Sequence, residues 1–258
     1  MTNEAAAVCR AAARRQGRNG HPTPTRDVHL ARLPGSQPAD EPAVPTRTAA
    51  SERVLAAGID LFFEVGFPAT TIRDLTARCG LTAAAFYNHF ESKEALLYTI
   101  VSEANARLDR QIDELELSES EPARSLTLLV GTLVTFNLAS PKEARIANRE
   151  YALLQPELRA QVVEHRRRIR ALFEQVLSSN RTARGLVKPE SHPRPDELDI
   201  RLLAISIINI SIAASDWFHT SGPLTIPEFA DTHGRLALRM AGLDQPKRAA
   251  RRKTNVPA

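Results

Sequence analysis

Cysteine is nearly absent from this chain of 258 residues, which contains only Cys9 and Cys79. Two cysteines supply neither a disulfide framework nor a four-ligand zinc site. Cys79 is best interpreted as a small apolar core residue at the end of a helix. The sequence therefore predicts no metal and no cofactor, and the cytoplasm is the expected compartment.

Two other patterns are missing. No alternation of period two with hairpin turns indicates β-strands, and no contiguous apolar stretch near the N-terminus indicates a secretory signal. From Arg47 onward, apolar residues recur instead at helical spacing. We therefore expect an all-α protein.

The two ends of the chain differ in composition from its middle. Residues 1–46 hold six prolines among small and polar residues, with no apolar period, so a disordered N-terminal extension is expected. A later start of translation, for instance at Val44, is an alternative hypothesis for this part. Residues 244–258 carry five basic residues and one acidic residue, which is typical of a basic disordered tail.

The most informative segment runs from Thr70 to Lys93, with the sequence TTIRDLTARCGLTAAAFYNHFESK. Ile72 and Leu75 share one face of a short helix, which Thr70 or Thr71 can cap. Gly80 allows a sharp turn, and Thr82 can cap a second short helix over residues 83–88. Two short helices around a turn are the layout of a helix-turn-helix (HTH) DNA reader.

With the preceding helix over residues 47–65, this segment resembles the TetR family of bacterial transcriptional repressors. The N-terminal domain of that family reads helix, G-F/Y-x-x-T-T/S, helix, G-V/L-S/T, a recognition helix ending in Y-x-H-F, and x-S-K-E-x-L. The matching residues are Gly66, Phe67, Thr70, Thr71, Gly80, Leu81, Thr82, Tyr87, His89, Phe90, Ser92, Lys93, Glu94 and Leu96. The resemblance implies an HTH domain over residues 47–97, followed by a larger helical effector-binding and dimerisation domain over residues 98–243.

The recognition helix departs from the family pattern at Ala83 and Ala84, where basic, polar or glycine residues are common. An alanine run favours contact with thymine methyl groups over bidentate reading of guanine. The HTH domain carries five basic and six acidic residues, so the basic excess of the chain lies in its flanks. DNA binding should therefore depend on helix N-termini and a few placed side chains.

Some of the expected DNA contacts have alternative roles. Tyr87 should point outward toward a phosphate, although it could close the small core. Lys93 begins a helix, where the dipole disfavours a cation, so a phosphate partner is expected. His89 stays open between phosphate contact and packing. The full set of expected DNA-binding residues is Thr70, Thr71, Thr82, Ala83, Ala84, Tyr87, Asn88, His89 and Lys93.

The larger domain shows helical spacing over residues 98–117, 122–139, 141–154, 156–176, 200–218 and 227–242. The family resemblance implies an effector pocket between these helices. Arg149 and the basic band at residues 165–168 favour an anionic ligand such as an acyl-CoA, although the band could also face solvent. The candidate ligand-binding residues are Phe136, Asn137, Asn148, Arg149, Tyr151 and Asn209.

The segment from Ile200 to Phe218 is almost long enough, and apolar enough, to suggest a membrane span. Arg201, Asn209 and Asp216 argue against a span, because buried charge is costly in a bilayer. A helix that is apolar all round must be covered on all sides. The resemblance implies that this helix and the one at 227–242 form a four-helix interface between two subunits. Its expected residues are Ile212, Trp217, Phe218, Leu236 and Met240.

These features predict a homodimeric repressor that binds a palindromic double-stranded DNA operator and is released by a small-molecule effector, with no membrane partner. An enzyme is disfavoured, because the nearest catalytic grouping, Ser215, Asp216 and His219, lacks an oxyanion or metal motif. The alternative is a helical protein-interaction adaptor whose basic tail binds nucleic acid without sequence preference.

Overall fold

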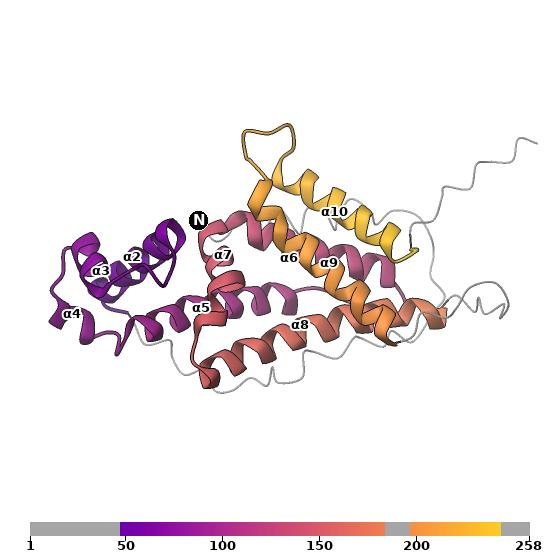
Figure 1. Ribbon diagram of the computed structural model, residues 1–258. Helices are drawn as coiled ribbons and strands as arrows, with labels where there is room; N and C mark the ends of the chain where they lie inside the picture. Colours follow the sequence, from indigo (N-terminus) through magenta and orange to yellow (C-terminus); the bar gives the residue numbers. More distant parts are fainter. Residues whose placement is uncertain (1–46, 184–196, 244–258) are drawn as a thin grey trace, which may run out of the picture.

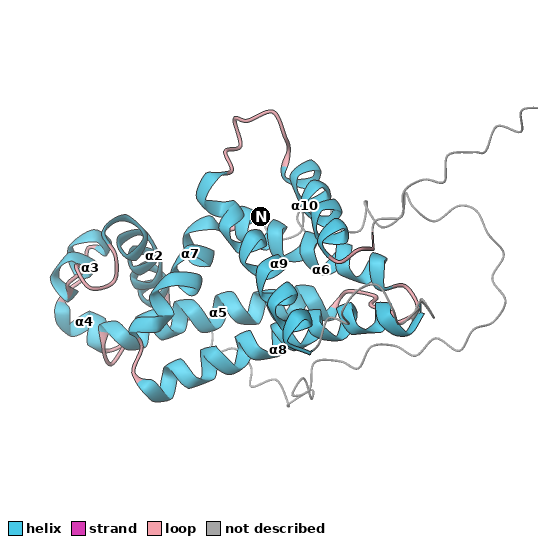
Figure 2. Ribbon diagram, turned by 45° about the vertical axis from the view of Figure 1, so that its right-hand side comes forward, coloured by secondary structure: helices cyan, strands magenta, loops and turns pink. Residues whose placement is uncertain are grey.

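The computed structural model describes residues 47–183 and 197–243, and all regular secondary structure within these ranges is helical. Its helices are drawn in Figures 1 and 2. The expected extension at 1–46 and the expected tail at 244–258 lie outside the described residues, as do residues 184–196. The elements are α2 (Ala49–Val65), α3 (Ile72–Cys79), α4 (Ala83–Tyr87), α5 (Lys93–Asp113), α6 (Pro122–Ala139), α7 (Pro141–Arg149), the 3-10 helix η1 (Glu150–Leu153), α8 (Pro156–Ala183), α9 (Glu197–Trp217) and α10 (Ile226–Met240).

The all-α fold class is thus confirmed, and several helix bounds differ from the prediction. Helix α5 ends at Asp113, four residues before the expected end at residue 117. The helix expected over residues 141–154 consists of α7 and η1, and Leu154 is extended before Pro156 begins α8. A proline at this place cannot continue the preceding helix. Helix α8 runs on to Ala183, beyond the expected end at residue 176.

Helices α2, α3 and α4 pack into a small N-terminal unit with its own core, seen at the left of Figure 1. Phe62 of α2, Leu75 of α3 and Phe86 of α4 meet Leu96 of α5 there, and none is more than 2% exposed. Gly66 and Gly80 end α2 and α3 with positive φ angles of 86° and 65°. Glycine adopts this conformation without a steric penalty.

Helix α5 is shared by both halves of the protein. Its first turns supply Leu96 and Leu97 to the N-terminal core, and its later turns bury Leu108 and Ile112 in the larger domain. Figure 1 shows α5 leaving the small unit and running into the helical bundle. The helix therefore crosses the expected domain boundary at residue 97 without a break.

Helix α6 is central to the larger domain, because α8, α9 and α10 all pack against it. The approach of α10 is close: a Cβ added at Gly234 would lie 3.0 Å from the Thr127 side chain on α6. Helix α7 packs against both α2 and α5 and so lies between the two domains (Figure 2).

Helix α9 is long and apolar enough to cross a membrane by length and composition, but it lies within this bundle. Its buried side rests on α6 and α8. Leu202 and Ile210 are 52% and 43% exposed, so the subunit leaves part of the apolar surface uncovered. That this surface packs on a second subunit stays a prediction.

Two helical glycines give a matched test of packing. An added Cβ at Gly58 would lie 2.8 Å and 3.2 Å from two atoms of Leu96, which is fully buried and has little room to move. Gly58→Ala should therefore lower the free energy of unfolding by about 1–3 kcal/mol. Gly131 of α6 has no such neighbour, and Gly131→Ala should raise the free energy of unfolding by about 0.5–1 kcal/mol. Urea unfolding at one protein concentration measures both, and equal effects would contradict this assignment.

Candidate functional site

Side chains cap the N-termini of α3 and α4. Thr71 and Asp74 form a reciprocal capping box, and Thr82 accepts a hydrogen bond from the backbone N–H of Ala85. Hydrogen bonds from the Thr71 hydroxyl and N–H lower the pKa of Asp74, which stays ionised at neutral pH. The turn between the two helices is made by Gly80 in the left-handed conformation, and the Leu81 N–H donates there to the carbonyl of Thr76.

The outer face of α4 carries the residues that the sequence placed there. Thr82, Ala83, Ala84, Tyr87 and Asn88 are all exposed. Phe86 and Phe90 are buried beneath them, as predicted. The helix therefore presents two methyl groups, a phenol and an amide to solvent.

Tyr87 is the most prominent side chain on this face, at 55% exposure. Its ring meets Phe86 edge-on at 5.4 Å, which sets its direction. No residue in the described part of the chain hydrogen-bonds its hydroxyl, which is free to bind an external acceptor. His89 is partly buried, and its imidazole has no hydrogen bond within the described residues, so its role stays open.

The expectation for Thr70 is wrong. Its side chain is only 1% exposed, and its hydroxyl donates to the carbonyl of Gly66 at 2.9 Å. Thr71, one residue later, is exposed and is the cap of α3. Thr70 therefore closes the loop between α2 and α3 and is removed from the DNA-binding set.

Lys93 also has a structural role that the sequence did not predict. Its ammonium donates to the carbonyls of Phe67 at 2.7 Å and Thr70 at 2.6 Å, and lies 4.4 Å from the centre of the Phe67 ring. These contacts explain why a lysine stands at the start of α5, and the explanation needs no phosphate partner. The prediction considered only the dipole of α5 and not the carbonyls of a loop that precedes it by more than 20 residues.

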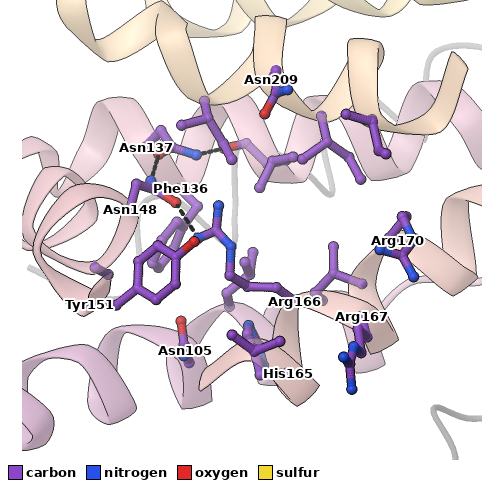
Figure 3. A pocket seen from close by; sticks show the side chains of 18 of the residues that line it. Asn105, Phe136, Asn137, Asn148, Tyr151, His165, Arg166, Arg167, Arg170 and Asn209 are labelled. Carbon is purple, nitrogen blue, oxygen red and sulfur yellow. Dashed lines mark hydrogen bonds between the residues drawn. The ribbon is translucent and has the colours of Figure 1, made fainter. Parts of the chain in front are cut away.

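A second site lies in the larger domain, where α5, α6, α7, α8 and α9 enclose a cavity of about 410 Å³ (Figure 3). One wall is apolar and includes Leu133, Phe136, Ile205, Ile208 and Ile212. The remaining lining is rich in asparagine and arginine. An apolar wall with converging polar groups is a usual feature of small-molecule sites, although about half of this cavity's lining residues are polar or charged.

Polar side chains in this cavity form one connected chain of hydrogen bonds. Arg166 donates to the Asn148 oxygen at 3.2 Å, Asn148 donates to Asn137 at 3.0 Å, and Asn137 donates to the Leu133 carbonyl at 2.7 Å. The Arg166 guanidinium also lies 4.7 Å from the Tyr151 ring centre. Figure 3 shows the chain running from α8 through α7 to α6.

The charge of the cavity lining is one-sided. Four arginines line it, whereas no aspartate or glutamate does. Arg167 and Arg170 pair with Glu164 and Glu174 on the same helix. The other two, Arg166 and Arg201, form no ion pair within the described ranges. Unpaired cations beside an apolar wall favour an anionic ligand.

Most of the candidate ligand-binding residues lie together in this cavity: Phe136, Asn137, Asn148, Tyr151 and Asn209 line it. Arg149 does not. It forms an ion pair with Asp216 at 2.7 Å and lines a separate crevice beside Phe63. Arg145 and Arg149 lie one turn apart on α7, and both side chains point away from the cavity. The candidate residues between 148 and 151 therefore lie on two different faces of this segment.

The sequence reasoning also missed lining residues. Asn105 on α5 and Arg201 on α9 line the cavity, but each is a lone polar residue in a helix and gives no signal of its own. His165 lines it too, as a member of the basic band at residues 165–168, which had no individually predicted roles. Ile212, expected at a subunit interface, is a cavity residue.

The other expected interface residues divide into two groups. Trp217, Leu236 and Met240 are 56%, 42% and 41% exposed, as an apolar interface requires. Phe218 is partly buried and meets Phe229 of α10 edge-on at 4.7 Å. Its side chain therefore joins α9 to α10 within the subunit.

The grouping near Ser215 shows no catalytic arrangement. Its carboxylate, Asp216, is held by Arg149, and the Ser215 hydroxyl donates to the Ile212 carbonyl. No cluster of three or more potential metal ligands occurs among the residues that the structure describes. The two built features are thus the exposed α4 face and the basic cavity.

Family comparison assigns both features. Residues 54–99 match the model of bacterial regulatory proteins of the tetR family, and residues 119–241 match the tetracyclin repressor-like C-terminal domain. The chain belongs to the TetR family. As a member of it, the protein is a DNA-binding transcriptional regulator, with α3 and α4 as its HTH.

Individual relatives agree with this assignment. The HTH-type transcriptional repressor KstR2 of Mycolicibacterium smegmatis is 23% identical over 208 residues, which are 79% of this chain and 96% of that protein. A tetR-family protein from Rhodococcus RHA1 superposes with a TM-score of 0.65 at 27% identity, covering 77% of this chain and 100% of that one. AibR, solved with isovaleryl coenzyme A and operator DNA, gives a TM-score of 0.60 at 22% identity, covering 72% and 97%.

Other relatives match over shorter segments. Two further HTH-type regulators are 52% and 35% identical over 46 and 81 residues, and the chain spans only 16% and 41% of their lengths. Such matches support the shared domain and leave the effector of this TetR-family protein to be inferred from its own cavity.

The free Tyr87 hydroxyl leads to a first prediction for DNA binding. Tyr87→Phe should weaken binding of all operator sequences about two- to tenfold, because one hydrogen bond to a phosphate is lost. The salt dependence should not change, since the hydroxyl is uncharged. Fluorescence anisotropy with labelled operator measures both. Thermal unfolding should match the wild type, and unaltered affinity would exclude the contact.

Lys93 leads to a second prediction, with a different signature. Lys93→Met should lower the free energy of unfolding by about 1–3 kcal/mol, because the carbonyls of Phe67 and Thr70 lose their donor. Arg73→Met is the matched control, since Arg73 is an exposed cation on α3 with no ion pair in the described residues. The opposite outcome would be a Lys93→Met protein that is as stable as the wild type but whose DNA affinity depends less on salt, with a log–log slope reduced by about one. That result would restore Lys93 as a phosphate contact.

Proposed function

We propose that this TetR-family protein is a homodimeric repressor of a palindromic operator and that an anionic, partly apolar small molecule releases it from DNA by binding in the cavity. The observation that supports this most directly is the lining itself, with four arginines, no carboxylate and one apolar wall. The cytoplasm, where the DNA is, is the proposed compartment.

Helix α7 gives a physical route from the cavity to the DNA-binding domain. Asn148 of α7 and Tyr151 of η1 line the cavity, and both contact Arg166. On the other side of α7, Lys142 bonds Asp60 of α2 at 2.5 Å, and Arg145 lies 5.0 Å from the Phe63 ring centre. A ligand that repositions Arg166 therefore acts on the segment that holds α2.

A second contact with the DNA-binding domain lies just after η1. The backbone N–H of Gln155 donates to the Glu94 carboxylate at the start of α5. The hydrogen bond that Lys142 donates to the Asp60 carboxylate raises the pKa of Lys142, so the other link stays charged at neutral pH. A ligand shifts an equilibrium only by its differential affinity for two states, and these links allow the cavity to sense the position of the DNA-binding domain.

The proposed dimer uses the exposed apolar surface of α9 and α10. Leu202, Ile210, Trp217, Leu236 and Met240 are all more than 40% exposed and lie on these two helices. Exposed apolar patches of this kind mark interaction surfaces. A two-fold axis here would present two α4 helices to successive half-sites of a palindrome.

The effector class follows from the two halves of the cavity. The aliphatic wall suits a hydrocarbon chain, and Arg166 and Arg201 suit a carboxylate or phosphate. An acyl-CoA combines both chemistries, and AibR was solved with isovaleryl coenzyme A. We therefore propose an acyl-CoA or another anionic hydrophobic metabolite as the effector.

The deciding experiment is selection of bound DNA from the promoter region beside the protein's own gene, with and without a panel of acyl-CoAs and fatty acids. Sequence-specific retention that a panel member abolishes supports the proposal. Uniform weak binding to all DNA would instead favour the adaptor function, and specific binding that no anion affects would refute the effector class alone.

Arg166 provides the sharpest variant. Arg166→Gln should raise the concentration of effector needed for half-release at least about tenfold, because a charged hydrogen bond to the anion is lost. Half-release is measured relative to the operator affinity of each variant without effector. Arg159→Gln is the control, since Arg159 lies on the exposed side of α8 and does not line the cavity. Anisotropy of a labelled operator during effector titration measures both, and equal half-release concentrations would rule out Arg166.

A further inference from the structure

Asp216 lies in the last turn of α9, where the helix itself disfavours an acidic side chain. The free carbonyls at a helix C-terminus carry partial negative charge, and no basic residue occupies this last turn. The partner of Asp216 is on another helix: Nη2 of Arg149, at the end of α7, lies 2.7 Å from its carboxylate. A contact between two helices therefore accounts for an acidic residue that the sequence of α9 does not explain.

Arg149 is one of three cations on one side of α7. They are Lys142, Arg145 and Arg149, and their separations of three and four residues place them on one helix face. Lys142 bonds Asp60 and Arg145 lies over the Phe63 ring, so the first two hold α2. The third holds α9. Helix α7, which lies between these two helices in Figure 2, thus connects the end of α9 to the DNA-binding domain.

A crevice of about 320 Å³ opens at this junction. Its lining comes from α2, α7 and α9 and consists of Phe63, Pro141, Arg145, Arg149, Ser215 and Asp216. Because open space lies between the three helices here, close apolar packing does not fix their relative positions at this point. The ion pair between two of the lining residues does so instead.

The same turn of α9 carries a residue of the proposed subunit interface. Trp217 follows Asp216 directly, is 56% exposed, and has its ring centre 5.0 Å from that of Phe229 on α10. In the proposed dimer, this turn is therefore held at a fixed distance from the two-fold axis. A side chain that joins α7 to this turn also places α2 and the HTH relative to that axis.

We propose that the ion pair between Arg149 and Asp216 is a positioning contact that sets the separation of the two DNA-binding domains, and so determines which half-site spacing the repressor accepts. This inference rests on the proposed function, because it requires a homodimer and a palindromic operator. It assigns to Arg149 a role in DNA recognition without contact to DNA.

The expected size of the effect follows from the exposure of the pair. The side chains of Arg149 and Asp216 are 52% and 40% exposed. Ion pairs of this kind change an equilibrium by a factor of about two to five, and the two copies in a symmetric dimer together give about four- to twentyfold. One added base pair moves two half-sites apart by about 3.4 Å and turns one against the other by about 35°. The contact should therefore affect discrimination between spacings and leave the reading of each half-site unchanged.

Operators that differ only in spacing test the proposal. The selected operator is compared with versions that have one base pair added or removed between the half-sites, by fluorescence anisotropy with the full-length protein. The wild type should prefer the selected spacing, and Arg149→Met should reduce the ratio of the affinities about four- to twentyfold. A variant that is merely less stable loses affinity for every operator alike, so its ratio stays the same.

An exchange of charges assigns the effect to the pair. Arg149→Asp alone places two carboxylates together and should lower the ratio at least as much as Arg149→Met. Combined with Asp216→Arg, it restores the pair in reverse and should recover the wild-type ratio to within about twofold. The matched control is Arg124→Met, because Arg124 pairs with Glu121 at 3.3 Å at the start of α6 and joins no distant helix to α7. This control should leave the ratio unaltered.

The outcomes separate this inference from the function on which it rests. If the wild type sediments as a monomer or shows no preferred spacing, the proposed homodimeric repressor fails and the inference fails with it. If the wild type is a dimer with a preferred spacing and Arg149→Met keeps the same preference, the inference alone is refuted. It is also refuted if the charge exchange does not recover the ratio, or if Arg149→Met dissociates the dimer.

Discussion

Helix α5 has to fit two hydrophobic cores at once, and the other parts of the molecule depend on this constraint. Leu96 and Leu97 belong to the small domain, and Leu108 and Ile112 belong to the large one. Because a helix is stiff along its axis and α7 packs on both α2 and α5, the two domains cannot turn freely about α5. The Lys93 ammonium, which binds the loop before α3, fastens the HTH to the first turn of the same helix.

The sequence predicted local features well and distant ones poorly, for a physical reason. The caps at Thr71 and Thr82 and the turn at Gly80 involve partners within a few residues, so spacing alone reveals them. The roles of Lys93 and Arg149 depend on partners 26 and 67 residues away, which no helical period encodes. The cavity was expected because the family resemblance implies an effector pocket between these helices, whereas its lone polar residues, such as Asn105, carry no pattern.

The division of charge explains how one molecule can bind two anionic partners separately. The DNA-reading face of α4 has no basic side chain, and the large cavity has four. An effector anion is therefore drawn to the interior of the larger domain and not to the DNA-binding surface. In the proposed dimer, recognition of DNA would depend on shape, caps and methyl groups, which suit a reader whose affinity comes from two weak contacts held at a fixed distance.

The hydrogen-bond chain in the cavity has a direction. An arginine can only donate, so Arg166 forces the oxygen of Asn148 toward itself, which turns the Asn148 amide nitrogen toward Asn137 and the Asn137 nitrogen toward the Leu133 carbonyl. Both amides are thus oriented from both ends, by a cation that can only donate and by the Leu133 carbonyl, which can only accept. In the proposed release mechanism, an anion that draws Arg166 away would leave α6 and α7 joined through Asn137 and Asn148 and would break only the connection to α8.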